Sequence, residues 1–166
     1  MTNWNDIVRE HGPGAYRVAW RILGHAQDCE DVVQEVFVEA HRHFTQGKVK
    51  HWPAFLHRLV TFRSLDALRR RRHVGSLDDE PVFDPSPGPE ETAVHREEEE
   101  RLRAAVAELP VRQAAVSCLA YFERMSHQEI AATLDVTANA VALALRKARL
   151  RLSEALSSGP KEENKS

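Results

Sequence analysis

The chain lacks any apolar run of about eighteen residues, the length that a membrane-spanning helix needs. Its first residues, Met1 to Asp6, also lack the basic start and apolar core of a secretion signal. These absences predict a protein that is not inserted into a membrane and that stays in the cytoplasm. With 166 residues, of which 42% are hydrophobic and 29% charged, the chain has the composition of a folded globular protein.

Cysteine is scarce, and the residue types that carry most enzyme chemistry form no recognisable set. Cys29 and Cys118 lie far apart among apolar helical positions, so we expect small buried thiols rather than a disulfide or metal ligands. The nine histidines are scattered without the spacing of a metal site. The chain also has no glycine-rich phosphate loop and no nucleophile motif. We therefore expect neither an enzyme nor a bound metal or cofactor.

The net charge of −2 hides two basic segments on either side of an acidic one. Residues 58–72 contain six arginines and one acid, and residues 146–151 contain four cations and no acid. Between them, residues 78–100 contain ten acids and one arginine. Charge blocks describe the partners of a protein better than its net charge does, and the basic blocks favour contact with nucleic acid.

Apolar residues recur at helical spacing almost throughout, and strand-like alternation is absent. The sequence therefore predicts an all-α fold. Residues 75–92 contain four prolines among acids, which predicts a flexible acidic linker. This linker would divide the chain into two small helical domains, residues 1–74 and 93–156. The polar residues 157–166 are expected to form a disordered tail.

Four helices are expected in the first domain. The first starts near Trp4 and breaks at Gly12-Pro13-Gly14, and the second ends at Gly24. The third is capped by Asp28. Its buried stripe is expected to contain Cys29, Val33, Val36, Ala40 and Phe44. The fourth helix, residues 52–72, has a proline in its first turn and apolar residues on more than one side, so we expect the central helix of a bundle.

In the second domain, residues 126–151 have the layout of a helix-turn-helix. Ser126 and Glu129 form a capping box at the start of a short helix. Asp135-Val136 forms the turn, and Thr137 caps the second helix. The stripe of this helix that is expected to be buried consists of Val141, Leu145, Ala148 and Leu152.

The second helix of this motif offers few side chains that can read a base. A rotation of about 100° per residue places four positions opposite the buried stripe: Asn139, Leu143, Arg146 and Leu150. Asn139 and Arg146 are expected to make polar contacts with DNA, while Leu143 meets either a thymine methyl group or a protein partner. The motif therefore predicts a DNA reader that positions more than it discriminates.

Two further segments carry charge at helical spacing. In residues 28–37 and just beyond, burial of the apolar stripe leaves Asp31, Gln34, Glu35 and Val38 on one outer side, which is either a solvated acidic face or a docking surface for a basic protein. Arg69 to Arg72 end the fourth helix. One or two cations would suffice at a helix C-terminus, so four of them favour phosphate contact. Of the nearby aromatic residues, Trp52 is expected to be exposed and available for base stacking.

In their order and spacing, these segments resemble a bacterial extracytoplasmic-function (ECF) sigma factor, a small two-domain specificity subunit of RNA polymerase. The resemblance covers about residues 7–156. The segments that carry it are Arg21-Ile-Leu-Gly24, Asp28–Phe37, Trp52–Arg72, Leu109-Pro110-Val111-Arg112-Gln113 and Ser126–Arg151. It implies a sigma-2-like helical bundle at 1–74 and a sigma-4-like helix-turn-helix domain at 93–156, joined by the linker.

The resemblance also implies partners and roles. Core RNA polymerase would bind the face formed by Asp31, Gln34, Glu35 and Val38, and the acidic linker would thread through the nucleic-acid channel of the polymerase. The melted minus-ten element of the promoter would contact Lys48, Lys50, Trp52, Arg58, Arg63, Arg69, Arg70, Arg71 and Arg72. The minus-thirty-five element would contact Ser126, Thr137, Ala138, Asn139, Ala142, Leu143, Arg146, Lys147 and Arg149. An anti-sigma factor that holds the two domains together would silence the protein.

Three places depart from the family pattern. Family members often carry asparagine where this chain has Phe62, glycine where it has Asp135, and Lys-Ser-Arg where it has Ala142-Leu143-Ala144. Two other interpretations stay open: a stand-alone helix-turn-helix regulator that binds duplex DNA without polymerase, and a helical adaptor with no DNA role. The two arginine-rich segments argue against the adaptor.

Overall fold

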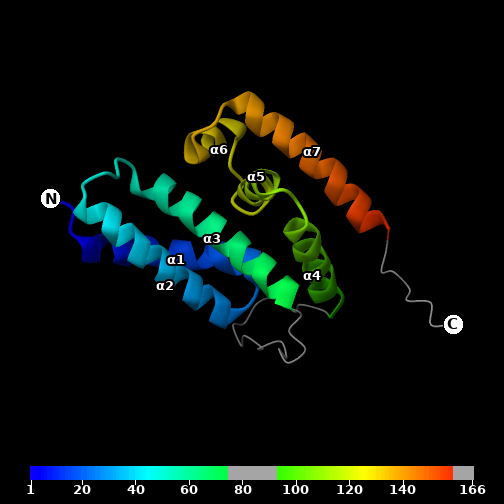
Figure 1. The fold of residues 1–166 in the computed structure, drawn as a ribbon, viewed down its shortest axis with the longest axis horizontal. Helices are drawn as coiled ribbons and strands as arrows, with labels where there is room; N and C mark the ends of the chain where they lie inside the picture. The colour runs from blue at the N-terminus through cyan, green and yellow to red at the C-terminus, as the bar shows by residue number, and fades with distance from the viewer. Residues whose placement is uncertain (75–92, 159–166) are drawn as a thin grey trace.

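The computed structural model describes residues 1–74 and 93–158, and these residues form seven α-helices and no strand (Figure 1). The predicted all-α fold is confirmed. We call α1 to α3 the first unit and α4 to α7 the second unit. The predicted acidic linker, residues 75–92, lies outside the described residues, as do residues 159–166 of the predicted tail. Among the helices that are described, none combines the length and the apolar character that crossing a bilayer requires.

Helix α1 (Trp4–Leu23) is continuous, so the predicted break at Gly12-Pro13-Gly14 is wrong. A proline inside a helix costs about 3 kcal/mol because it removes a hydrogen bond and crowds the preceding turn. Here the helix buries apolar side chains on both sides of Pro13, from Ile7 to Leu23, and this packing outweighs the local cost. The predicted end is confirmed: Gly24 adopts a left-handed conformation with φ of 61° and donates to the carbonyl oxygen of Trp20.

Helix α2 (Ala26–Thr45) begins two residues before the predicted cap. His25 is the N-cap, and its Nδ1 accepts a hydrogen bond from the backbone of Asp28 at 3.4 Å, so Asp28 lies in the first turn instead. The buried stripe contains Val32 rather than Val33, and Phe44, also predicted in the stripe, is only partly buried. This shift of one position leaves the predicted polar side of the helix in solvent.

Helix α3 (Trp52–Val74) is the central helix, as predicted. It packs on α1 and α2, and it also contacts α4, α5 and α6 of the second unit (Figure 1). Trp52 is partly buried rather than exposed, because its ring meets those of Trp4, Phe44 and Phe55 with centroids 5.7 to 6.1 Å apart. The prediction for this residue was wrong because it ignored aromatic partners from other helices.

The second unit consists of α4 (Ala93–Ala107), α5 (Val111–Tyr121), α6 (His127–Leu134) and α7 (Ala138–Ser157). Residue 157, with which the predicted tail begins, is therefore still helical. The helix-turn-helix is α6 and α7, and the buried stripe predicted for α7 is confirmed. The capping box is confirmed as well: Ser126 Oγ accepts from the Glu129 amide at 3.1 Å, and Glu129 Oε2 accepts from the Ser126 amide at 2.7 Å.

The turn between α6 and α7 explains one departure from the family pattern. Asp135 has a φ of 55°, in the left-handed region that glycine adopts most readily. Aspartate is among the few other residues that tolerate this conformation. The turn therefore keeps the geometry that the usual glycine would give.

Candidate functional site

The predicted polymerase-binding face is exposed on α2. Asp31, Gln34, Glu35 and Val38 are all accessible, and Val38 exposes 54% of its surface although it is apolar. An open groove of about 700 Å³ between α1 and α2 continues this face. The residues that line the groove are Trp4, Val8, Tyr16, Glu30, Val33, Gln34, Phe37, Val38, His41 and Arg42. An acidic rim beside an apolar groove can bind a basic, partly apolar protein surface.

The contribution of α1 to this groove was missed from the sequence. Trp4, Val8 and Tyr16 lie on α1, whereas the sequence pattern pointed only to α2. The available signal in the sequence was Val8, an apolar residue on the outer side of an amphipathic helix, which often marks a contact surface. In the structure 37% of its surface is exposed.

A cluster of aromatic rings lies where α2 ends and α3 begins, beside the loop that joins them. The Trp4 ring lies 5.0 Å from His41, 5.5 Å from Phe44 and 6.1 Å from Trp52. These residues fix the end of α2 against the start of α3. Lys48 and Lys50, in the loop beside this cluster, are exposed.

The arginines predicted to contact the minus-ten element all lie on α3, but most of them form ion pairs or hydrogen bonds with other residues of the chain. Arg58 is exposed. Arg63 forms an ion pair with Glu39 of α2, and this hydrogen bond raises the pKa of Arg63. Arg70 pairs with Asp66 one turn earlier, at 2.8 Å.

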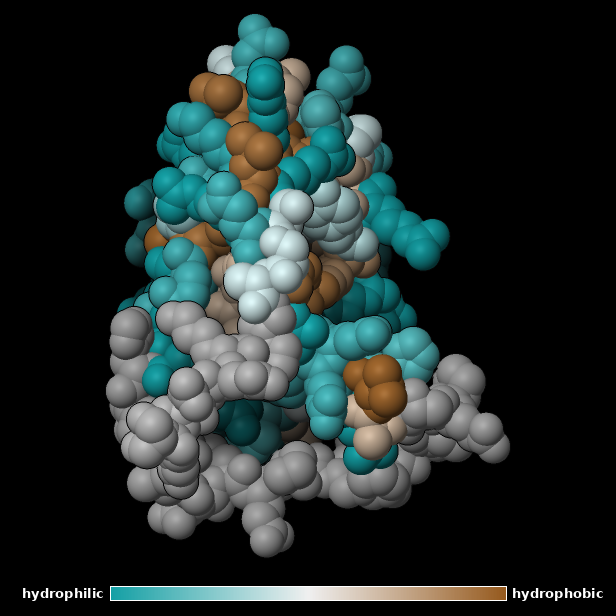
Figure 2. All heavy atoms as spheres, turned by 90° about the vertical axis from the view of Figure 1, so that its right-hand side faces the viewer, coloured by the Kyte–Doolittle hydropathy of each residue, from teal (hydrophilic) through white to brown (hydrophobic). Residues whose placement is uncertain are grey.

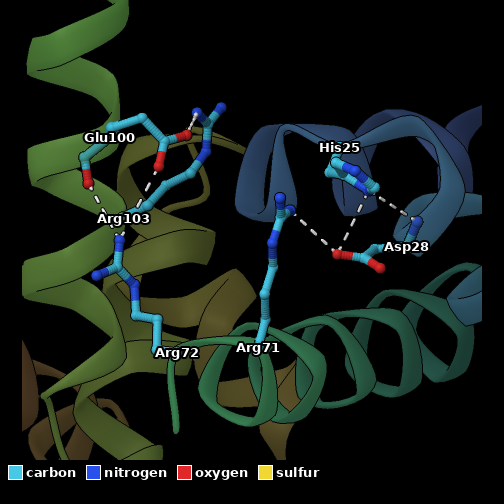
Figure 3. A network of polar contacts seen from close by, with 6 residues as sticks. All are labelled: His25, Asp28, Arg71, Arg72, Glu100 and Arg103. Carbon is cyan, nitrogen blue, oxygen red and sulfur yellow. Dashed lines mark hydrogen bonds and ion pairs between the residues drawn. The ribbon is translucent and has the colours of Figure 1, made fainter. Parts of the chain in front are cut away.

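Side chains from the last turn of α3 contact both units (Figure 3). Arg71 lies 3.1 Å from Asp28 of the first unit, and Asp28 also lies 3.5 Å from His25. Arg72 points instead toward Glu100 of α4, donating to its carbonyl oxygen at 3.4 Å. Arg69 donates to the carbonyl oxygen of Leu109, between α4 and α5. Two of the predicted DNA-contacting cations thus hold the second unit.

A further contact between the units was missed from the sequence. Glu123, just after α5, lies 2.8 Å from Arg21 of α1 and 3.8 Å from His57 of α3, and its side chain is only 12% exposed. Burial raises the pKa of Glu123, but hydrogen bonds from His57 and Arg21 outweigh burial and leave the pKa lowered. The same hydrogen bond raises the pKa of His57. No sequence signal links these residues, because Arg21 and Glu123 are 102 positions apart.

The second candidate surface is the outer side of the helix-turn-helix. All of the residues predicted to meet the minus-thirty-five element are exposed, from Ser126 to Arg149. Asn139 and Arg146 share the outer side of α7 with two exposed leucines, Leu143 at 54% and Leu150 at 61%. Arg149 turns back to the Tyr121 hydroxyl at 2.6 Å, so this cation is positioned by α5.

The three residues of the unusual segment Ala142-Leu143-Ala144 differ in their exposure to solvent. Ala144 is buried against the core of the second unit, whereas Ala142 and Leu143 are exposed. Only the first two residues therefore change the surface that α7 presents. Figure 2 shows the end of the molecule where α4 and α7 lie; the described residues that are visible there are largely hydrophilic, with small hydrophobic patches between the polar groups.

The two cysteines are buried thiols, as predicted. Burial raises the pKa of Cys29 to about 11 and that of Cys118 to about 12. At neutral pH both are therefore unreactive. In the part of the chain that the structure describes, no cluster of histidine, cysteine and carboxylate side chains could hold a metal ion.

Comparison with known proteins identifies the class. Residues 7–74 match the family described as "Sigma-70 region 2", and residues 99–152 match the family described as "Sigma-70, region 4". The chain belongs to the sigma-70 family of RNA polymerase sigma factors, and within this family it is of the ECF type.

Named relatives support the ECF type. The ECF RNA polymerase sigma factor SigE of Mycolicibacterium smegmatis is 32% identical over 163 residues, which cover 94% of this chain and 62% of SigE. The chain thus spans less than two thirds of the length of that relative. The ECF RNA polymerase sigma factor SigW of Bacillus subtilis is 23% identical over 91% of this chain and 87% of SigW.

Two solved structures share the fold. CnrH in complex with the cytosolic domain of CnrY aligns with a TM-score of 0.63 and 24% identity, over 94% of this chain and 88% of that one. The sigma factor RpoE in complex with the anti-sigma factor NepR, from Bartonella quintana, aligns with a TM-score of 0.58 and 18% identity, over 92% and 95%. At these identities the likeness concerns the fold alone.

Proposed function

We propose that the chain acts as an ECF sigma factor, binding bacterial core RNA polymerase, directing it to specific promoters and promoting DNA melting. The observation that carries this proposal is the presence of three separate surfaces on one small chain: the groove and acidic face of α1 and α2, the arginine-rich α3, and the helix-turn-helix. A stand-alone DNA regulator needs only the last of these. The protein would be a specificity subunit rather than an enzyme, and it would work in the cytoplasm, with polymerase and promoter DNA.

Each surface has a proposed partner. Asp31, Gln34, Glu35 and Val38, together with the α1 side of the groove, would dock on the core enzyme. The loop after α2 and the arginines of α3 would hold the melted minus-ten strand, because a positively charged helix beside a loop with two exposed lysines suits an unstacked single strand. The α7 helix would lie in the major groove of the minus-thirty-five element, with Asn139 and Arg146 toward the bases.

We propose the division into two domains that the sequence suggested, residues 1–74 and 93–156. The acidic segment 75–92 would cross the nucleic-acid channel of the polymerase, where its charge suits a cleft built for RNA. We further propose that an anti-sigma factor controls the protein, since two structures that share its fold are complexes with the CnrY cytosolic domain and with the anti-sigma factor NepR.

The experiment that tests this proposal is selection of fragments from a random DNA library by the chain alone and by the chain with core polymerase. We expect a sequence with two separated elements to be enriched only when core polymerase is present. Enrichment of one duplex motif by the chain alone would favour the stand-alone regulator. Absence of enrichment with a core enzyme that initiates normally with another sigma factor would rule out the sigma-factor function.

A further inference from the structure

The second unit occupies the same helix that the promoter would need. His57, Arg69 and Arg72 of α3 all contact the second unit, through Glu123, Leu109 and Glu100 respectively. These three contacts span four turns of α3, so the second unit covers the helix along most of its length. Two of the three contacting residues, Arg69 and Arg72, are also predicted to bind the minus-ten strand.

Burial along α3 agrees with this cover. By helical spacing, Thr61, Ser64 and Leu68 lie on the same side of α3 as His57 and Arg72. All three are buried, with exposures of 0%, 0% and 4%. This side of α3 is therefore closed to a nucleic-acid strand in the structure.

We propose that the chain is autoinhibited: the second unit closes over α3, and Glu123, held by Arg21 and His57, fastens the closed arrangement. This inference rests on the proposed function, because it assigns α3 to the minus-ten strand. Opening would free Arg69 and Arg72 for phosphates. It would also let the two units separate, as contact with two distant promoter elements requires.

Two properties of the contact between the units favour its opening: buried hydroxyl groups without partners, and polar contacts. The Thr61 and Ser64 hydroxyl oxygens are buried and have no hydrogen-bond partner among the described residues. A buried hydroxyl without a partner costs free energy, and it regains hydrogen bonds when water reaches it. The ion pairs of Glu123 and the hydrogen bonds of Arg69 and Arg72 add polar contacts between the units, and polar contacts are typical of interfaces that separate.

The fastening can be tested by measuring the distance between the units in the full chain. One dye is placed on α1 by Asn5→Cys and the other on α7 by Ser153→Cys, both exposed positions. The buried Cys29 and Cys118 react slowly, so the labels go to the new thiols. Glu123→Gln removes the charge that Arg21 and His57 hold, and Glu10→Gln makes the same change at an exposed position on α1.

We expect Glu123→Gln to raise the ratio of open to closed molecules about tenfold, since charge-assisted hydrogen bonds of a mostly buried carboxylate are strong. Arg21→Gln should have a similar effect, and the double variant should add little to either single change. Glu10→Gln should leave the distance distribution unchanged. If both Glu123→Gln and Arg21→Gln keep the wild-type distribution, the fastening is wrong.

A second readout tests the link to DNA. The probe is a fluorescein-labelled single-stranded oligonucleotide of mixed sequence, titrated with each free chain. Opening should tighten binding by up to about tenfold in Glu123→Gln, because the apparent affinity follows the fraction of binding-competent molecules. Unchanged binding despite an open distance distribution would show that the second unit does not block α3.

Transcription with core polymerase separates failure of this inference from failure of the proposed function. Glu123→Gln lies outside the proposed polymerase and DNA surfaces, so the variant should support the same transcripts as the wild type. A chain that is active with core polymerase but shows no change in distance refutes autoinhibition alone. A wild-type chain that is inactive with an active core enzyme refutes the sigma-factor function, whatever the distance measurement gives.

Discussion

Arg69 donates a hydrogen bond from α3 to the backbone carbonyl oxygen of Leu109, at the junction of α4 and α5. This hydrogen bond uses one of the N–H donors that the guanidinium group could give to a phosphate. The same residue is predicted to bind the minus-ten strand, so the second unit and the strand would compete for its guanidinium group. This relationship ties the packing of the two units to the proposed reading of DNA.

Reversing charge on the outer side of α2 should weaken binding to core polymerase. We expect the double variant Asp31→Lys and Glu35→Lys to lose about tenfold or more in affinity, because like charges would then face a basic docking surface. Fluorescence anisotropy of labelled chain titrated with core enzyme measures this. The matched control, Glu10→Lys with Glu108→Lys, changes two exposed glutamates elsewhere and should bind normally. Equal affinity of the two variants would remove α2 from the polymerase interface.

The outer side of α7 should set promoter selectivity. Asn139→Ala and Arg146→Ala should each lower discrimination at the minus-thirty-five element about tenfold, the cost of one lost base contact. Competition between the selected promoter and a scrambled element, measured with holoenzyme, gives the ratio. Arg17→Ala, an exposed cation on α1, serves as control.

Leu143→Ala distinguishes two roles for the exposed leucine of α7. A loss of selectivity confined to one base pair would place Leu143 against a thymine methyl group. Unchanged selectivity would leave this leucine, 54% exposed, to a protein partner.

The capping box of α6 should stabilise the second unit. Ser126→Ala should lower the free energy of unfolding by about 1 kcal/mol, because it removes the acceptor of the Glu129 amide and half of the reciprocal pair. Urea denaturation followed by circular dichroism measures the difference. Ser153→Ala, at an exposed position inside α7, should change stability little.

The closed arrangement should loosen as pH rises above 6.5, the usual pKa of histidine, and through the raised pKa of His57. The Glu123 carboxylate raises the pKa of His57 above its usual 6.5. The stabilisation from His57 is therefore complete below the pKa of the open state and is lost as pH rises through the raised value. The lowered pKa of Glu123 acts at the acid end, where the closed arrangement loses stability as pH falls and the carboxylate is protonated.

The distance between dyes on α1 and α7 reports this dependence directly. We expect a change of about threefold in the ratio of open to closed molecules, since the pair is partly exposed to solvent. His57→Gln should remove the alkaline part of the profile. An alkaline transition of the same size in His57→Gln would assign it to another group.

Local signals were enough to predict most helix ends and the helix-turn-helix. The capping box at Ser126, the glycine at Gly24 and the apolar stripe of α7 act within a few residues, so the sequence displays them directly. The break expected at Pro13 failed because packing along the whole of α1 outweighs one local cost. The cap expected at Asp28 failed because the ring nitrogen of His25 takes that role.

The contacts between the units could not be predicted in the same way. Arg21, His57 and Glu123 come from three separate parts of the chain, and no periodicity relates them. The arginines at the end of α3 were predicted to contact DNA, but two of them have partners inside the protein, Glu100 and Leu109, that depend on how the second unit packs. The sequence shows which residues are charged, but it does not show which of them contact each other in the folded chain.

Run-off transcription with purified core polymerase tests the central claim most directly. The template is the sequence selected from the random library, and the start sites are read by sequencing the transcripts. Addition of the chain should give transcripts from one defined start, downstream of both elements, that are lost in the Asp31→Lys and Glu35→Lys variant. No chain-dependent transcript, from a core enzyme shown to be active with another sigma factor, would contradict the account.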